Sequence, residues 1–279
     1  MSNKWKKWAF DLLKLLICIF LCVIMLFPFI WMVSTSFKYS WEVVAFPPRI
    51  LPQEFAGFEA YRTVFQEIPF ATFLKNSGLV AIAVTITTLF TSSLAGYVFA
   101  KFNFIGKQYY FMAILATMMI PFDVICIPLY LLIRQIGLLN NLFALILPGM
   151  VSAYGIFLCR QFIRGIPDSL VDASRIDGCS EFGIYFTIIL PLSLPVLSAL
   201  GIFTFMANWD SFLWPLIVLD DVSKKTLPLG LSLFRQTFGM ARWNVIMAGA
   251  VISILPIMIV FLLAQKNFIE GITLSGMKM

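Results

Sequence analysis

Residues 15–33 read LLICIFLCVIMLFPFIWMV, a run of 19 residues without a charge. As a helix this run would be about 28 Å long, close to the roughly 30 Å hydrocarbon core of a bilayer. A cleaved signal peptide would have a shorter apolar region followed by small residues. Bulky Phe27, Phe29 and Trp31 stand at that place instead. The run therefore predicts a retained membrane anchor.

The composition of the rest of the chain agrees with a membrane protein. Of the 279 residues, 61% are hydrophobic and 12% charged, and the mean hydropathy is +0.94. Soluble domains carry roughly 25% charged residues. Six apolar stretches are long enough to cross a membrane, so we expect an all-α integral membrane protein forming a single transmembrane domain over residues 1–279. The expected spans are residues 15–36, 76–100, 108–133, 142–160, 184–207 and 243–265.

Small residues, prolines and one acidic residue within the apolar stretches predict how the spans pack and where they are interrupted. Ser92, Gly96 and Ala100 recur every four residues in the second span, which predicts a smooth face for close helix packing. Prolines and Asp123 interrupt the third span, and prolines occupy the early turns of the fifth. Residues 211–219 are apolar but too short to span, so we expect them to be re-entrant or interfacial. The aromatic and proline-rich segment 37–73 is expected to lie along the membrane surface.

The distribution of lysines predicts the orientation of the chain. Four lysines precede the first span and one, Lys38, follows it closely, which favours a cytoplasmic N terminus. Six spans then return the C terminus to the cytoplasm. The net charge of +6 follows from basic residues near membrane ends, and no motif for nucleic acid accompanies it.

The residue types disfavour catalysis by this chain. It has no histidine, and its five cysteines form no CxxC pair or metal-ligand cluster, so we expect no metal site. A phosphate-binding loop is also missing, because Gly106-Lys107 is followed by Gln108 rather than Ser or Thr. We therefore expect no nucleotide to bind to this chain through such a loop.

A polar segment between the fourth and fifth spans carries the functional argument. Residues 160–183 read RQFIRGIPDSLVDASRIDGCSEFG. Pro167 suits a helix start, and Asp168 and Ser169 are expected to cap its first turn. Leu170, Ala173 and Ser174 would then share a small or apolar side. Asp177-Gly178 predicts a turn, and Ser180 opens a second helix. We call residues 164–183 the knuckle, and a knuckle of this kind suits the groove of a partner protein.

The knuckle resembles the cytoplasmic EAA loop of ABC-importer permeases. That pattern is Glu-Ala-Ala-x-x-x-Gly followed by Ile-x-Leu-Pro. Asp172 replaces Glu and Ser174 replaces the second Ala, and each keeps charge or size. The matching residues are Asp172, Ala173, Ser174, Gly178, Ile188, Leu190 and Pro191.

Other segments resemble the carbohydrate-importing branch, in particular the smaller permease subunit of maltose-type systems. Together they cover most of the chain. They are 46–48 (FPP), 76–77 (NS), 92–97 (SSLAGY), 127–130 (IPLY), 137–138 (GL), 208–213 (NWDSFL) and 271–273 (GIT).

The resemblance implies a type I ABC importer permease fold and a set of partners. These partners are a second homologous permease in a heterodimer, an ATPase dimer that holds ATP and magnesium, and an extracytoplasmic solute-binding protein. The implied cellular location is the bacterial cytoplasmic (inner) membrane. No cofactor would bind to this chain. The C-terminal tail 275–279 would reach toward the ATPase interface. The implied coupling residues are Asp168, Asp172, Ala173, Ser174, Asp177, Gly178, Leu190 and Pro191.

The cargo is assigned by resemblance to a sugar or small oligosaccharide, and a polyol, glycerol phosphate or amino acid stays open. Each candidate for the cargo path also has a structural interpretation. Asp123 suits a cargo or gate contact, or a structural acid near the outer end of its span. Trp209, Asp210 and Trp214 could line the path or touch the binding protein, or they could form an interfacial aromatic belt. Tyr154 and Phe157 suit either the path or helix packing, and Asn208 is a further candidate for the path.

Two other classes of function fit the residues less well. An ion-coupled secondary transporter would usually carry several charges inside its spans, and only Asp123 qualifies. A membrane-embedded enzyme would need paired acids, a metal cluster or a nucleophile with a base, and the spans offer none of these.

Overall fold

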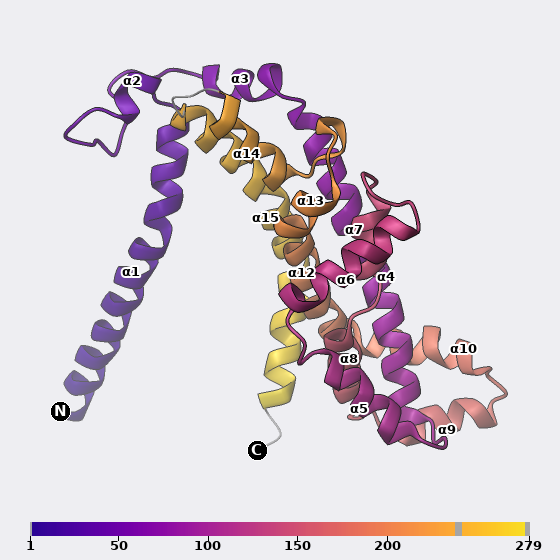
Figure 1. Ribbon diagram of the computed structural model, residues 1–279. Coiled ribbons are helices and arrows are strands. Elements are labelled where there is room, and N and C mark those ends of the chain that lie inside the picture. Colours follow the sequence, from indigo (N-terminus) through magenta and orange to yellow (C-terminus); the bar gives the residue numbers. More distant parts are fainter. Residues whose placement is uncertain (1, 238–241, 277–279) are drawn as a thin grey trace. The chain divides into compact units, whose positions relative to one another are not determined.

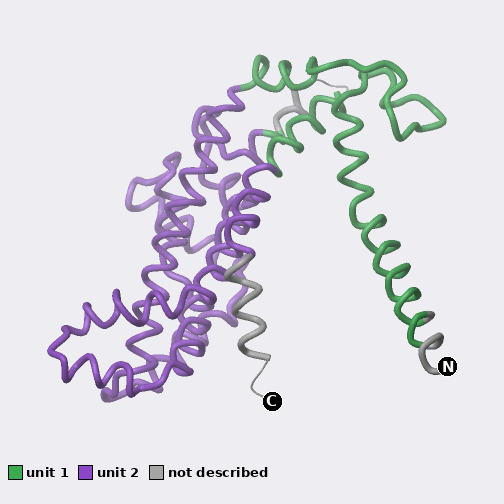
Figure 2. Tube along the Cα trace, turned by 180° about the vertical axis from the view of Figure 1, so that it is seen from behind, with its two compact units in different colours: residues 1–68, 231–254 green, residues 69–230, 255–279 purple. Residues whose placement is uncertain are grey.

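The computed structural model describes residues 2–237 and 242–276, and these residues form helices joined by turns, without a strand (Figure 1). The tail residues 277–279, for which a contact with the ATPase is expected, lie outside the described residues. Contacts divide the chain into two compact units (Figure 2). Unit 1 comprises residues 1–68 and 231–254, and unit 2 comprises residues 69–230 and 255–279. This division is based on contacts and does not test the expectation of one transmembrane domain over residues 1–279, which stays a prediction.

Unit 1 is built around the long first helix. It contains α1 (Ser2–Ser36), α2 (Ser40–Val43), α3 (Glu59–Glu67) and the first part of α15 (Trp243–Gly276). The most apolar part of α1, within Phe10–Ser36, buries none of its residues inside the chain. A helix that is apolar on all sides is covered by lipid or by another membrane protein. Unit 1 therefore leaves α1 to be covered by lipid or by a partner in the membrane.

Unit 2 holds the remaining helices around one long helix, α4 (Phe70–Lys101). Apart from α15, its other elements are shorter. They are α5 (Lys107–Thr117), α6 (Phe122–Gln135), α7 (Phe143–Gly149), α8 (Ala153–Ile163), α9 (Asp168–Ile176), α10 (Glu181–Ile184), η1 (Tyr185–Ile189), α11 (Leu190–Leu192), α12 (Leu194–Trp209), α13 (Leu213–Val218), η2 (Val222–Lys224), α14 (Leu227–Thr237), which ends in unit 1, and the second part of α15.

The helices confirm the membrane-protein fold class but differ in detail from the expected spans. Four helices are long and apolar enough to cross a membrane: Phe10–Ser36, Phe70–Lys101, Phe143–Ile163 and Trp243–Gln265. Two further pairs pass the same test but are bent. The pair α5 and α6 bends by 97°, and the pair ending in α12 bends by 76°. The number of spans is six if each bent pair crosses once.

Proline chemistry explains where the bends fall. Pro121 immediately precedes α6, and Pro195 lies in the first turn of α12. Proline lacks an N–H and disfavours a helical residue before it, so a helix tends to end there. Pro128 lies inside α6 without ending it, although the sequence suggested a further interruption at that residue.

The predicted smooth face of α4 packs against α8. A Cβ atom at Gly96 would come 2.7 Å from the Cβ of Cys159 and 2.9 Å from the backbone nitrogen of Arg160. One turn earlier on α4, Ser92 fills the same role against Gly155 of α8. The small residues therefore let the two backbones approach closely, as expected of helices in lipid.

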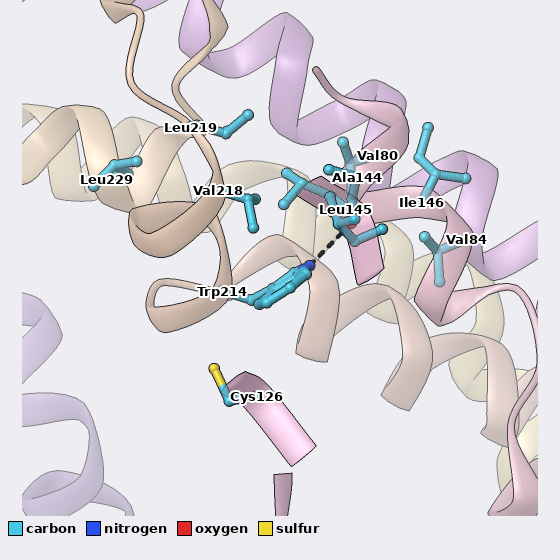
Figure 3. Packing of buried hydrophobic residues seen from close by; sticks show 11 residues of the cluster. Val80, Val84, Cys126, Ala144, Leu145, Ile146, Trp214, Val218, Leu219 and Leu229 are labelled. Carbon is cyan, nitrogen blue, oxygen red and sulfur yellow. Dashed lines mark hydrogen bonds between the residues drawn. The ribbon is translucent and has the colours of Figure 1, made fainter. Parts of the chain in front are cut away.

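The apolar stretch 211–219 forms a short packed helix. Its central part is α13, six residues long. Trp214 and Val218 join a buried cluster with residues of α4 and α7 (Figure 3). The indole Nε1 of Trp214 donates to the carbonyl of Ala144 at 3.0 Å, which satisfies the indole inside the apolar cluster. The expectation that this stretch is too short to span agrees with the length of α13.

The α4–α8 contact gives a stability prediction. We expect Gly96→Ala to destabilise the chain by roughly 1–3 kcal/mol, because the added methyl overlaps backbone atoms that cannot move freely. Gly78→Ala on the same helix is the control, since its Cβ would meet no described heavy atom within 4 Å. Thermal unfolding in detergent measures both. Equal unfolding temperatures for the two variants would contradict the close contact.

Candidate functional site

The knuckle has the helix–turn–helix form that its sequence predicts. Helix α9 ends at Ile176, and the N–H of Asp177 donates to the carbonyl of Ala173 at 2.9 Å. Gly178 takes a φ of +81°, which reverses the chain and favours glycine. Helix α10 then begins after Ser180, whose Oγ accepts the N–H of Gly183 at 3.1 Å.

The start of α9 differs from the expectation. Pro167 precedes the helix, and no side chain caps that end. The carboxylate of Asp168 instead accepts a hydrogen bond from the ammonium of Lys101, with Nζ and Oδ1 2.5 Å apart. The same ammonium donates to the carbonyl of Ile166. An ion pair with Lys101, at the end of α4, therefore replaces the predicted cap.

The bond to Lys101 also sets the charge state of Asp168. It holds the pKa of the Asp168 carboxyl below its usual range, by the hydrogen bond first and the positive charge second. Asp168 is thus ionised at neutral pH, and the start of the knuckle stays attached to α4.

A second ion pair joins the two helices of the knuckle. The guanidinium of Arg175 in α9 donates to both carboxylate oxygens of Glu181 in α10, at 2.8 and 3.3 Å. The hydroxyl of Tyr97 in α4 donates to the same carboxylate at 2.8 Å. The bond from Arg175 lowers the pKa of Glu181, so its carboxylate stays charged at neutral pH. Bidentate pairs of this kind fix geometry as well as charge. We call Arg175, Glu181 and Tyr97 the clamp.

Apolar contacts seat the inner side of the knuckle. Val171 is 1% exposed and packs with Ile184 and Tyr185 in a buried cluster that includes Tyr97. The hydroxyls of Tyr185 and Ser93 form a hydrogen bond, with their oxygens 2.7 Å apart. The side of α9 predicted from Leu170, Ala173 and Ser174 is not this buried side. Leu170 is exposed, and Val171 supplies the buried contact.

The outer side of the knuckle is exposed. Ile176 is 86% exposed and Phe182 is 65% exposed. Large apolar side chains in such positions often mark an interaction surface. The candidate coupling residues Asp168, Asp172, Ala173, Asp177 and Gly178 are also exposed, and Ser174 is half-buried. They lie in or next to α9 and its turn.

Two further candidates lie apart from the outer side of the knuckle. Leu190 and Pro191 are in α11, which follows the knuckle through η1. Leu190 packs on the buried cluster below Val171. Leu190 is half-buried, and Pro191 is exposed.

Sequence reasoning did not single out the clamp or Lys101. Arg175 and Glu181 lie six residues apart with a glycine turn between them, so their opposite charges are a usable signal for a pair. The contacts of Tyr97 and Lys101 depend on how α4 passes the knuckle. That placement is a tertiary feature, which the sequence of either segment does not carry.

The cargo-path candidates separate into three groups. Tyr154 and Asn208 line a common cavity of about 500 Å³ in unit 2. Phe157 stacks on Phe111, with ring centres 6.5 Å apart, and so packs helices together. Trp209 is buried against Phe205, with ring centres 5.6 Å apart. The third group comprises the exposed acids Asp123, in the first turn of α6, and Asp210, at the end of α12.

The cavity lies beside a break between two helices. Helix α7 ends at Gly149 and α8 begins at Ala153. Two α4 side chains hold the freed carbonyls: Thr88 Oγ1 donates to Gly149 at 2.8 Å, and Thr91 Oγ1 donates to Met150 at 2.9 Å. Broken backbone at membrane depth is tolerated where it is satisfied or lines a cavity. Among the described residues, the lining is uncharged and includes Thr88, Thr117, Ser152, Tyr154, Thr204 and Asn208.

Comparison with known proteins places the chain in a family. Residues 92–273 match the model of the binding-protein-dependent transport system inner membrane component. The chain belongs to this family of importer permeases. It is accordingly a multi-pass inner-membrane protein and a transport permease rather than an enzyme. The matched region includes the knuckle and the lining of the cavity apart from Val84 and Thr88.

Individual relatives agree with this family. The permease is 36% identical, over 93% of each chain, to the arabinooligosaccharides transport system permease protein AraQ of Halalkalibacterium halodurans. It is 36% identical, over 73% of each chain, to the sn-glycerol-3-phosphate transport system permease protein UgpE of Pectobacterium atrosepticum. Its fold is similar to a chain of a bacterial ABC transporter involved in import of the acidic polysaccharide alginate. That match has a TM-score of 0.82 and 24% identity, over 93% of this chain and 96% of the other.

The clamp gives a prediction for the permease. We expect Glu181→Gln to lower transport while the amount of chain in the membrane stays unchanged. The amide keeps the size but loses the charge, and an exposed pair of this kind contributes about 1 kcal/mol or less to stability. Substrate uptake and chain level measure the two effects. The control is Asp11→Asn, which removes an exposed ion pair with Lys14 on α1, far along the sequence from the knuckle. An equal loss of uptake in both variants would contradict a specific role for the clamp.

Proposed function

We propose that this permease forms half of the translocation pathway for a sugar or small oligosaccharide and is driven by a separate ATPase through the knuckle. The observation that carries the proposal is an exposed turn with apolar neighbours, attached to α4 by the Lys101–Asp168 ion pair and by the hydrogen bond from Tyr97 to Glu181. Its coupling residues are Asp168, Asp172, Ala173, Ser174, Asp177 and Gly178, with Leu190 and Pro191 behind them.

The attachment of the knuckle explains how motion would pass into the membrane. ATP and magnesium bind to the partner ATPase dimer, and closure of that dimer displaces the knuckle. Because Lys101 and the clamp join the knuckle to α4, the displacement moves α4 with it. The cavity at Thr88 lies about 20 Å away along the same helix. Coupling of this kind is a rigid-body transition between two states.

The orientation and assembly follow from the same proposal. The knuckle and both termini lie in the cytoplasm, where the ATPase is. A second homologous permease completes the pathway as a heterodimer, and an extracytoplasmic solute-binding protein delivers the cargo. No cofactor binds to this chain.

The cavity favours an uncharged cargo. Its hydroxyl and amide groups suit the hydroxyls of a saccharide, and Tyr154 offers an aromatic face. The similarity to the arabinooligosaccharides permease supports the same class. Glycerol phosphate is the second candidate, because a relative of similar identity is named for it. A phosphate would need cationic partners, and the described lining of the cavity has none, so the saccharide is favoured.

Gentle purification of a tagged chain from native membranes tests the assembly. We expect an ATPase, a second permease and a solute-binding protein to copurify, and the ligand of that binding protein identifies the cargo. Recovery of the chain alone, or as a homo-oligomer without an ATPase, would favour a self-sufficient secondary transporter instead.

The turn of the knuckle gives a mutational test. We expect Gly178→Arg to abolish transport and reduce recovery of the ATPase, while the chain still inserts. A Cβ at Gly178 would meet no described heavy atom within 4 Å, so the bulk of arginine points into space open to a partner, although the φ of +81° strains any L side chain. Gly178→Asn is the matched control, because asparagine tolerates a positive φ. Normal transport by Gly178→Arg would exclude docking at this turn.

The cavity gives a further test. We expect Asn208→Leu to raise the KM for saccharide uptake by a factor of roughly 2–10, which corresponds to one neutral hydrogen bond. Asn103→Leu, in the exposed loop after α4, is the control. An unchanged KM in Asn208→Leu, with normal assembly, would remove Asn208 from the cargo path.

A further inference from the structure

A loop in unit 1 has its polar groups inside and its apolar groups outside. Lys38 and Glu42, at the base of the loop, are 2% and 5% exposed. Phe46 is 93% exposed and Leu51 is 72% exposed. A loop in water normally shows the reverse arrangement, because buried charges cost free energy and exposed large apolar groups gain none. The arrangement of this loop therefore suits an apolar environment.

The buried groups hold the loop in one shape. The Lys38 ammonium donates to the carbonyl of Arg49 at 2.5 Å, and the N–H of Gln53 donates to Glu42 Oε1 at 2.7 Å. The N–H of Ala56 closes the loop onto the carbonyl of Phe37 at 3.0 Å. Because these bonds act from inside, the fold itself presents the outer side chains. We call these side chains the apolar patch: Trp41, Val44, Phe46, Ile50, Leu51 and Phe55.

Contacts with α1 fix the depth of the loop relative to the membrane. The Ser34 hydroxyl donates to the carbonyl of Ile50. The Lys38 ammonium lies 4.7 Å from the centre of the Trp31 ring. Trp31 and Ser34 are at the end of the apolar run of α1, the level at which a spanning helix passes from hydrocarbon into the headgroups. The loop thus turns back to the level of the membrane surface (Figure 1).

We propose that the apolar patch inserts into the boundary between headgroups and acyl chains, in the leaflet at the Ser36 end of α1. Arg49 is exposed on the same loop, where a cation can meet lipid phosphates. A soluble protein would have to reach into the membrane surface to cover the patch. Lipid is already present at that depth. The proposal needs only that α1 spans the membrane, so it is independent of cargo and of coupling.

Photo-crosslinking in the assembled protein tests the proposal. The photoreactive residue p-benzoylphenylalanine replaces Phe46, and in a second variant Leu51, in the full chain in native membranes. It is close to phenylalanine in shape, so the fold is disturbed little. Phe20 and Leu26, on different faces of α1, are the lipid-facing controls. Gln66, exposed on α3, is the control for an aqueous position. Lipid adducts are measured by mass spectrometry as a fraction of total chain.

Three outcomes decide the proposal. We expect lipid adducts at Phe46 and Leu51 at a yield similar to the α1 controls and several-fold above Gln66. Crosslinks to another protein, in place of lipid, would overturn the proposal and make the patch a protein interface. Absence of adducts at both positions, with normal yields at the α1 controls, would place the patch in water and also overturn it. If the variant at Phe46 or at Leu51 fails to accumulate, the lipid adducts of the other variant decide the proposal.

Discussion

A backbone inside hydrocarbon has no water to bond with, and the structure of this permease follows from that constraint. Each apolar stretch forms a helix because a helix satisfies its own N–H and C=O groups. Where a helix is interrupted, other groups take over. Between α7 and α8 the hydroxyls of Thr88 and Thr91 bond the freed carbonyls of Gly149 and Met150. The break can therefore line a cavity without leaving polar groups unsatisfied.

Helix α4 links the two parts of the molecule to which we assign function. Its middle holds the helix break and lines the cavity through Thr88. Its next turns pack closely on α8 through Ser92 and Gly96. Its last turn holds the knuckle through Tyr97 and Lys101. Close packing without gaps transmits displacement rather than absorbing it, so one helix can serve both the cavity and the knuckle.

The two ends of the knuckle are fixed by charge, and its outer side is left free. Lys101 and Arg175 lower the pKa values of Asp168 and Glu181, so both pairs keep their charge to a lower pH than unpaired carboxyls would. Exposed pairs like these contribute little to overall stability. Their effect is geometric, because they hold α9 and α10 against α4 while Ile176 and Phe182 stay available to a partner. The loop in unit 1 has the reverse arrangement, because the charged side chains of Lys38 and Glu42 are buried and the apolar patch is exposed.

Much of the fold could be predicted from the sequence, because the relevant signals are local. Long uncharged runs predict spans, Asp177-Gly178 predicts the turn, and Ser180 predicts the second helix start. The small residues of α4 predict a close helix contact. Predictions of detail were weaker where local rules compete. Asp168 was expected to cap α9 and instead pairs with Lys101, because a cation 67 residues away offers it a stronger bond.

The sequence by itself determined the fold class, the apolar segments and the helix–turn–helix form of the knuckle, since hydropathy, turn residues and motif spacing act over short distances. Only the tertiary structure decided which residues meet. It brought Tyr97 to Glu181, Tyr154 to Asn208 and Ile50 to Ser34, and it separated Trp209 and Asp123 from the cavity. The physical reason is that these contacts depend on the bends between helices and on close packing. Both are properties of the whole chain in three dimensions.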